Sequence, residues 1–272
     1  RPTFITETLA SGVQLVTGYE YDPVGNLVKV VDPEGLETRY TYDDWNLLVA
    51  ERQVKGGLEL RRSGYGYDVL GQRTVITDAL GYSTTFQYDG VGRVITTTDA
   101  LGQQTIAGYD GNGNRTSFRD AGGNLTTYVY DALNRLTAVY EPLGRTTGYA
   151  YDAVGNRTVI TDALGYTTRY DYDALNRPLT ITNALTGTTS YQYDKVGNRT
   201  VITDANNQAT RYGYDAANRL VSVTDALSHT TGYGYDMVGN RTVITDANGL
   251  TTTMVYDYLR RLVLVSDGLG NE

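Results

Sequence analysis

The chain has 272 residues, with 31 acidic side chains against 23 basic ones, a formal net charge of −8 and no cysteine. A nucleic acid or an anionic membrane surface needs a cationic face on its partner, so this balance disfavours both. The lack of cysteine excludes a disulfide framework and a cysteine-based zinc site. No apolar run approaches the roughly 20 residues that span a bilayer as a helix.

A Tyr-Asp pair recurs along the whole sequence, and ten of the eleven intervals between successive pairs are 21 residues long. The interval from Tyr42 to Tyr67 is 25 residues and defines a longer variant of the repeat. The first repeat is of the same variant, because Arg1 is as far from Tyr19 as Leu47 is from Tyr65. The twelve pairs begin at Tyr21, Tyr42, Tyr67, Tyr88, Tyr109, Tyr130, Tyr151, Tyr172, Tyr193, Tyr214, Tyr235 and Tyr256. Such a period is the signature of a repeat architecture. We predict one array over residues 1–272.

The two ends of the sequence are both in repeat phase. The opening residues 1–6 resemble residues 177–182, and the chain stops at Gly270-Asn271-Glu272 in the middle of a unit. We therefore interpret the chain as a piece cut from a longer array at both ends.

Residues 151–172 illustrate the predicted elements of one unit. Asp152-Ala153-Val154-Gly155 has the Asp and Gly of a type I turn closed by a left-handed residue, because Asp accepts a backbone hydrogen bond two residues on and Gly tolerates positive φ. The β-branched run 157–161 predicts a strand, 162–165 repeats the turn chemistry, and 167–172 predicts a second strand. Connections this short exclude parallel crossovers, so we expect an antiparallel meander with two strands in each repeat.

The period of two along a strand predicts which residues share a face. Tyr170 and Tyr172 lie on one face, and the same spacing recurs in most copies, with Phe86, Ala107 and Met254 in place of the first tyrosine. The ninth residue after the Tyr of each Tyr-Asp pair is Val, Ile or Phe in ten repeats, and we expect it on the tyrosine face. Glu51 and Thr97 break this rule.

A second period of 42 residues is superimposed on the first. Repeats with Gly-Asn-Arg, as at Gly155-Asn156-Arg157, alternate with repeats that have Asn-Arg one residue earlier, as at Asn176-Arg177. Asn also tolerates the left-handed conformation, so the turn is the same. The shifted Arg changes face unless a β-bulge absorbs the step, and the sequence leaves both possibilities open.

The predicted fold class is all-β: antiparallel β-hairpin repeats of about 21 residues, paired into 42, in one continuous sheet. About 24 strands spaced at roughly 4.8 Å make a ribbon on the order of 110 Å long. Open twisted sheets rarely exceed about ten strands without curling. We therefore expect the ribbon to coil as a spiral sheet, shell wall or tube, in which each repeat contacts mainly its neighbours.

The motif in residues 168–177, with Gly165 upstream and equivalents in every copy, resembles the RHS/YD-repeat family. The resemblance implies long β-ribbons that form hollow shells around a toxic domain in secreted bacterial toxins and insecticidal toxin complexes, and related arrays in cell-wall and adhesion proteins. It implies no active site and no cofactor. The motif residues to which we assign a structural role are Tyr109, Asp110, Tyr130, Asp131, Tyr151, Asp152, Gly155, Asn156, Arg157, Tyr172, Asp173, Asn176, Arg177, Tyr193, Asp194, Gly197, Asn198, Arg199, Tyr214, Asp215, Tyr235, Asp236 and Gly239.

Catalytic and metal-binding patterns are weak. His229 is the one histidine and lies at a turn, where we interpret it as a surface residue. The carboxylates recur regularly, which favours turn capping over general acid–base catalysis. Asp110-Gly111-Asn112-Gly113-Asn114 imitates the start of an EF-hand loop, but Arg115 and Ala121 stand where Gly and Glu are required. We predict no catalytic residue, cofactor or metal site, with calcium at the turn carboxylates left as an alternative.

Two further alternatives concern sugars. Five asparagines (Asn114, Asn124, Asn156, Asn198 and Asn240) begin Asn-x-Thr sequons, which turn chemistry explains without glycosylation. Rows of tyrosine could stack on sugar rings, although packing within the sheet also explains them.

We hypothesise a non-catalytic shell segment of a secreted or cell-surface bacterial protein. Its expected partners are neighbouring repeats of a longer chain and an enclosed toxin domain. The alternative is a segment of an extracellular fibre or adhesin whose partners are identical chains, and which binds carbohydrate.

Overall fold

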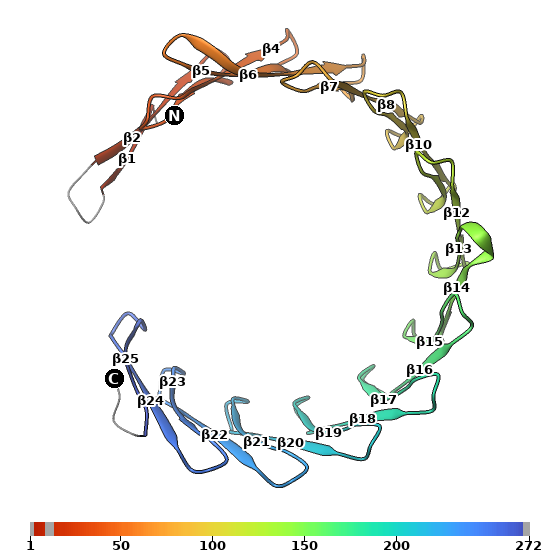
Figure 1. Cartoon of the computed structure of the whole chain (residues 1–272), viewed down its shortest axis with the longest axis vertical. Coiled ribbons are helices and arrows are strands. Elements are labelled where there is room, and N and C mark those ends of the chain that lie inside the picture. The colour runs from red at the N-terminus through yellow and green to blue at the C-terminus, as the bar shows by residue number, and fades with distance from the viewer. Residues whose placement is uncertain (1–2, 9–13, 269–272) are drawn as a thin grey trace. The chain divides into compact units, whose positions relative to one another are not determined.

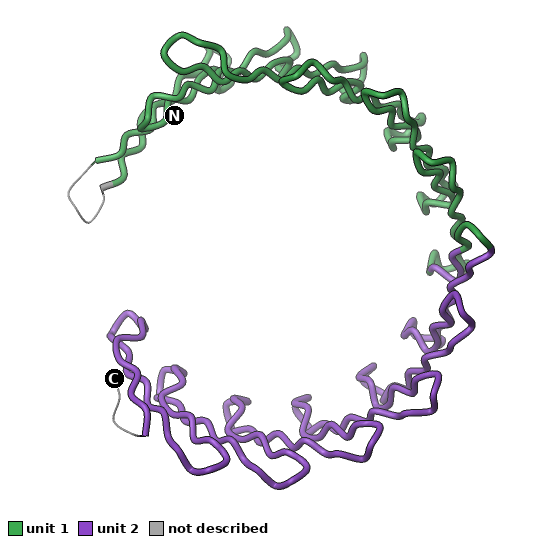
Figure 2. Tube along the Cα trace, in the orientation of Figure 1, with its two compact units in different colours: residues 1–135, 140–143 green, residues 136–139, 144–272 purple. Residues whose placement is uncertain are grey.

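The computed structural model describes residues 3–8 and 14–268. The expected likeness of residues 1–6 to a later repeat falls partly outside this range, as does the end of the chain at residues 270–272. Contacts divide the chain into two units, residues 1–135 with 140–143 and residues 136–139 with 144–272, which we call unit 1 and unit 2 (Figure 2).

Unit 1 is built from strands that pair antiparallel with the next strand along the chain (Figure 1). They are β1 (Phe4–Thr8), β2 (Gln14–Tyr21), β3 (Leu27–Val31), β4 (Glu37–Tyr42), β5 (Leu48–Lys55), β6 (Leu58–Tyr67), β7 (Arg73–Thr77), β8 (Ser83–Tyr88), β9 (Val94–Thr98), β10 (Gln104–Tyr109), β11 (Arg115–Arg119) and β12 (Leu125–Tyr130). Strand β13 (Leu136–Tyr140) and the short 3₁₀ segment η1 (Pro142–Gly144) follow.

Unit 2 continues the same pattern of consecutive antiparallel pairs. Its strands are β14 (Thr146–Tyr151), β15 (Arg157–Thr161), β16 (Thr167–Tyr172), β17 (Pro178–Thr182), β18 (Thr188–Tyr193), β19 (Arg199–Thr203), β20 (Ala209–Tyr214), β21 (Leu220–Thr224), β22 (Thr230–Tyr235), β23 (Arg241–Thr245), β24 (Thr251–Tyr256) and β25 (Leu262–Ser266). The predicted all-β class and the antiparallel hairpin repeats are confirmed.

The predicted turn conformation is also confirmed. In the turn after β14, the N–H of Gly155 donates to the Asp152 carbonyl and Gly155 has φ of 101°. Asp152 Oδ1 accepts the N–H of Val154, two residues on, at 3.1 Å, and also the N–H of Asn156 at 2.8 Å. In the alternate repeats Asn176 takes the left-handed position with φ of 61°. Thus one turn serves both classes of repeat.

The strand register places the expected residues on one face. Tyr149 lies directly opposite Ile160, and Tyr170 lies directly opposite Ile181. Directly opposite residues on neighbouring strands share a face of the sheet, so in these repeats the ninth residue after the Tyr of the Tyr-Asp pair lies on the tyrosine face, as predicted. Glu51 breaks the apolar pattern yet still occupies this position, opposite Tyr40.

A β-bulge is present in both classes of repeat, at the same place. Tyr151 pairs with Arg157 and Tyr172 pairs with Pro178, each six residues on, and the register shifts just before each tyrosine. The bulge therefore does not compensate for the shifted arginine. Instead, Arg177 precedes its strand as the last turn residue, whereas Arg157 is the first strand residue. Both guanidinium groups lie over rings of the tyrosine face, Arg177 over Tyr193 and Arg157 over Tyr149.

Within each unit the sheet is a single layer. Among the described residues only Ala50 and Val201 are buried hydrophobic residues. The accessible surface is 17768 Å², whereas a compact monomer of 29.8 kDa exposes about 11,600 Å². The face residues are mostly half-buried, so each hairpin gains its burial from the hairpins beside it.

The long variant forms an extended hairpin. β5 and β6 have 8 and 10 residues, against 5 or 6 in most strands, and are joined through Gly56 and Gly57, both with positive φ. This hairpin carries charged side chains where other repeats carry apolar or hydroxyl ones.

Replacement of Gly197 by Val should lower the free energy of unfolding by more than about 1 kcal/mol, because its φ of 103° strains a β-branched residue. Urea unfolding followed by circular dichroism measures the change. As a control, Gly232→Ala places a Cβ in an ordinary strand position, 3.9 Å from the Thr245 Cβ, and should not destabilise. Equal stability of the Gly197 variant and the wild type would contradict the turn assignment.

Candidate functional site

The Tyr-Asp turns line one edge of the sheet, which we call the Tyr-Asp edge. It comprises the turns that follow each Tyr-Asp tyrosine, such as residues 152–156 and 173–177. Here the tyrosine hydroxyl donates to the carbonyl at the start of a strand in the preceding repeat: Tyr172 to Arg157 at 3.0 Å and Tyr193 to Pro178 at 2.9 Å. The same bond of 2.6–3.2 Å is made by Tyr42, Tyr67, Tyr88, Tyr109, Tyr130, Tyr151, Tyr214, Tyr235 and Tyr256.

Asparagine side chains link four Gly-Asn turns to the next turn along the Tyr-Asp edge. Asn156 Nδ2 donates to Asp152 Oδ2 at 2.9 Å and to Asn176 Oδ1 of the following repeat at 2.8 Å. The same bridge joins Asn26 to Asn46, Asn114 to Asn134 and Asn198 to Asn218. The left-handed Asn of the alternate repeats therefore has two functions: it closes its own turn and it accepts the bridge.

Arginine makes the next link. Arg177 Nε donates to Asp173 Oδ2 at 2.7 Å, its Nη1 reaches the Asp194 carbonyl at 3.4 Å, and its guanidinium carbon lies 4.4 Å from the centre of the Tyr193 ring. Arg93 and Arg219 repeat this arrangement. Asn links and Arg links alternate, and this alternation explains the period of 42 residues.

The same contacts stabilise the charged form of the turn aspartates. The Arg177 side-chain hydrogen bond, together with the Arg177 N–H, lowers the pKa of Asp173, and the Asn114 side-chain hydrogen bond lowers the pKa of Asp110. In the Gly-Asn-Arg repeats a neutral Asn side chain, such as that of Asn156, donates to the turn Asp in place of an Arg, while Arg157 stacks over Tyr149.

The motif residues assigned from sequence gather on this edge. The assigned tyrosines donate across repeats, and Asp110, Asp131, Asp152, Asp173, Asp194, Asp215 and Asp236 cap their own turns. Gly155, Gly197 and Gly239 have positive φ. Arg157 and Arg199 stack on tyrosines.

His229 lies away from this edge, in the turn between β21 and β22. Its Nδ1 is 3.0 Å from Asp225 Oδ2, and the side chain is 58% exposed. The sequon amides of Asn114, Asn124, Asn156, Asn198 and Asn240 each donate to a turn Asp. No group of three or more His, Asp or Glu side chains fit for a metal ion occurs within residues 3–8 and 14–268.

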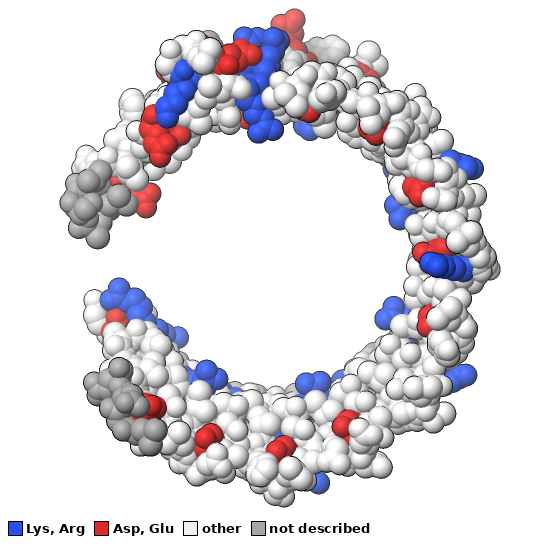
Figure 3. Space-filling model, in the orientation of Figure 1, with Lys and Arg blue, Asp and Glu red and all other residues white. Residues whose placement is uncertain are grey.

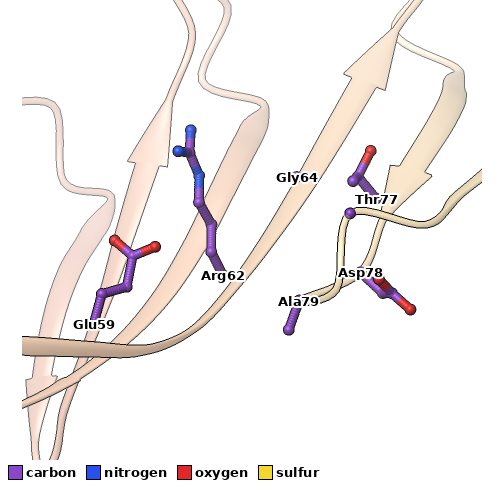
Figure 4. Close-up of a pocket in the computed structure, with 7 residues that line it drawn as sticks. Glu59, Arg62, Gly64, Thr77, Asp78 and Ala79 are labelled. Carbon is purple, nitrogen blue, oxygen red and sulfur yellow. The ribbon is translucent and has the colours of Figure 1, made fainter.

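A hollow of about 450 Å³ lies where the extended hairpin meets the next turn (Figure 4). Glu59 and Arg62 of β6 stand on one side, and Asp78 and Ala79 of the turn after β7 stand on the other. Asp78 is engaged in its turn through the N–H groups of Leu80 and Tyr82.

The RHS Repeat family model matches nine stretches of the chain. The chain belongs to the RHS repeat family. The matched residues are 21–58, 62–104, 109–146, 130–167, 151–189, 172–209, 193–230, 214–249 and 235–272. From residue 109 on, successive matches begin 21 residues apart, in step with the Tyr-Asp pairs.

Solved structures with a similar fold include the TcdB2-TccC3 crystal structure, at 17% identity and a TM-score of 0.64. A second crystal structure, of TcdB2-TccC3 without its hypervariable C-terminal region, has the same identity and TM-score. The matches cover 93% of this chain but only 17% and 16% of those chains, so this chain spans a small part of their length. No curated protein sequence matches the chain. No helix in the described part of the chain could cross a membrane.

The hydroxyl-to-carbonyl bond was not predicted from sequence, although the repeats contain a signal for it. The tyrosine before Asp is present in all twelve copies, whereas the tyrosine two residues earlier is replaced by Phe86, Ala107 and Met254. Phenylalanine and methionine fill space but cannot donate. Only the tyrosine of the Tyr-Asp pair therefore needs its hydroxyl, and the structure shows that the acceptor is a backbone carbonyl of the preceding repeat.

Replacement of Tyr193 by Phe should destabilise the chain by about 0.5–1.5 kcal/mol, because it removes the hydrogen bond to the part-buried Pro178 carbonyl. The matched control is Tyr191→Phe on the same strand and face, whose hydroxyl forms no hydrogen bond among the described residues. Urea unfolding of both variants gives the difference, and equal losses would contradict the role of the hydroxyl.

Stability should fall in acid. Since the folded pKa of Asp173 and Asp215 is lowered, their contribution is present above the unfolded pKa of about 3.9 and is lost as pH falls through the folded pKa. Melting temperature measured against pH tests this.

The double variant Asp173→Asn/Asp215→Asn should show a shallower acid dependence. Asn183 occupies the first position of a similar turn at the opposite edge and accepts the N–H groups of Leu185 and Gly187, so an amide fits this kind of turn. The control is Asp44→Asn, an exposed carboxylate that accepts no hydrogen bond within the described residues. An unchanged slope in the double variant would rule out these carboxylates as the source.

Proposed function

We propose that this chain is a non-catalytic wall segment of a β-sheet shell, in a protein secreted by a bacterium, which encloses and delivers a toxin or effector. The observation that carries the proposal is that the family model matches repeat after repeat of a sheet that has almost no buried core. The fold shared with TcdB2-TccC3 over 93% of the chain supports it. The single array over residues 1–272 is part of this proposal.

A wall has two faces and no core of its own. The surface of 17768 Å² exceeds that of a compact protein by about half. Stability then comes from the links between neighbouring repeats, so further repeats can be added without a change in how the existing ones pack. Such a sheet encloses volume with few residues, as a container requires.

The turn tips supply a means for coils of a longer ribbon to adhere. Val154 at the Tyr-Asp edge is 73% exposed, and Leu164 at the opposite edge is 81% exposed. Equivalent apolar tips recur at Val24, Leu70, Val91, Leu133, Leu175 and Val196, and at Leu80, Leu101, Leu143, Leu185 and Leu227. Rows of exposed apolar side chains mark interaction surfaces, and contact between successive coils of the proposed spiral would bury both rows.

The state of the carboxylates supports a non-catalytic role. A general acid at neutral pH needs a raised pKa, whereas each Asp and Glu with a shifted pKa, such as Asp131 and Glu37, is shifted downward by its own turn or ion-pair contacts. The aspartates among these groups hold turns closed, and Glu37 pairs with Arg39.

An extracellular fibre is the second candidate. The Asn side-chain bridges between repeats measure 2.8–2.9 Å in all four places. The same link can therefore join any number of repeats in a fibre. A fibre built in this way would act through its repeated surface and would have identical chains as partners.

Electron microscopy of the full-length protein that carries this segment, purified from the culture medium of the producing cells, distinguishes the two. We expect a hollow particle whose internal polypeptide resists protease until the wall is opened. An open filament with constant rise per repeat pair would favour the fibre. Retention of all the protein inside the cells would contradict secretion.

A further inference from the structure

Four basic side chains stand in a row across strands β3 to β6 of unit 1. Lys29 is directly opposite Arg39, Arg39 is opposite Arg52, and Arg52 is opposite Arg62. All four point to the face away from the tyrosines, because Lys29 is opposite Glu20, which lies between Tyr19 and Tyr21. We call these four residues the basic row.

The basic row is a departure from the repeat pattern. At the position equivalent to Arg39, Arg169 lies between Val159 and Thr182, and Arg211 lies between Val201 and Thr224. Directly opposite residues are about 5 Å apart, and like charges at this distance destabilise a sheet. The long variant therefore accepts a cost that the other repeats avoid.

Counter-charges within the chain neutralise only half of the row. Lys29 pairs with Glu20, and Arg39 pairs with Glu37 at 2.6 Å. Arg52 has only a contact of 4.0 Å with Glu59, and its buried Nε lacks a hydrogen-bond partner. Arg62 forms no ion pair within the described part of the chain. Two adjacent guanidinium groups thus keep free donors.

The surroundings leave room for a ligand group beside these donors. Arg62 borders the hollow of about 450 Å³ (Figure 4), and the Arg52 side chain is 41% exposed. Charged side chains of both signs crowd over β5 and β6 in unit 1 (Figure 3).

We propose that the basic row, centred on Arg52 and Arg62, is a docking strip for an acidic peptide segment of a partner protein. A carboxylate placed between the two arginines relieves their repulsion and accepts hydrogen bonds from their exposed N–H groups, and a guanidinium matches a carboxylate with two hydrogen bonds.

The acids on the same face decide the class of partner. Glu20, Glu37 and Glu59 lie beside the row, and they repel a densely charged polymer such as a sulfated polysaccharide. A peptide with carboxylates spaced along it places one charge between the arginines and keeps others away from the glutamates. This docking strip requires neither the shell nor the fibre.

The test is binding of a fluorescent peptide in which glutamate alternates with serine, measured by fluorescence anisotropy on the whole chain. The double variant Arg52→Gln/Arg62→Gln should bind about tenfold more weakly. The matched control Arg169→Gln/Arg211→Gln removes the same charge from isolated positions and should change affinity less than about twofold. Binding should weaken as ionic strength rises.

Three results would overturn the proposal. They are equal losses in the two double variants, equal binding of a peptide with glutamine in place of glutamate, and stronger binding of a heparin tetrasaccharide than of the glutamate peptide. Thermal unfolding gives an independent check. Loss of the repulsion should leave the melting temperature of the Arg52→Gln/Arg62→Gln variant unchanged or raised, and a clear fall would make the row a structural element.

Discussion

A tyrosine hydroxyl that reaches the backbone of the preceding repeat is the contact on which this structure depends. Each hairpin buries almost nothing by itself, since only Ala50 and Val201 are buried hydrophobic residues in the described chain. The ring of Tyr172 covers a neighbour while its hydroxyl satisfies the Arg157 carbonyl. Packing and hydrogen bonding thus act at the same place, and a hairpin becomes stable only beside another hairpin.

The turns at the Tyr-Asp edge turn a row of similar hairpins into an ordered series. An Asn bridge joins one repeat to the next, and an Arg stacked on tyrosine joins that one to its successor. Because the two links use different side chains, a Gly-Asn-Arg repeat fits best between two Asn-Arg repeats. This gives a physical reason for the 42-residue unit, and it disfavours slippage by one 21-residue repeat.

The long hairpin of β5 and β6 shows what an array gains from one irregular unit. Identical repeats present the same surface everywhere, so specificity at one place needs a departure from the pattern. Arg52 and Arg62 are such a departure, and their repulsion is a cost to stability that a functional surface commonly carries. The regular repeats around them supply the stability that makes this cost tolerable.

Local residue chemistry determined much of this protein from sequence alone. Asp152 and Gly155 specified a turn, the alternation at Tyr170 and Tyr172 specified a face, and the repeat length specified hairpins, because each depends on residues close together in the chain. The acceptor of the tyrosine hydroxyl, the place of Arg177 over Tyr193 and the alignment of the basic row were decided only by the tertiary structure. They depend on the bulge and on strand register, which set residues from different repeats opposite one another, and no single repeat contains that information.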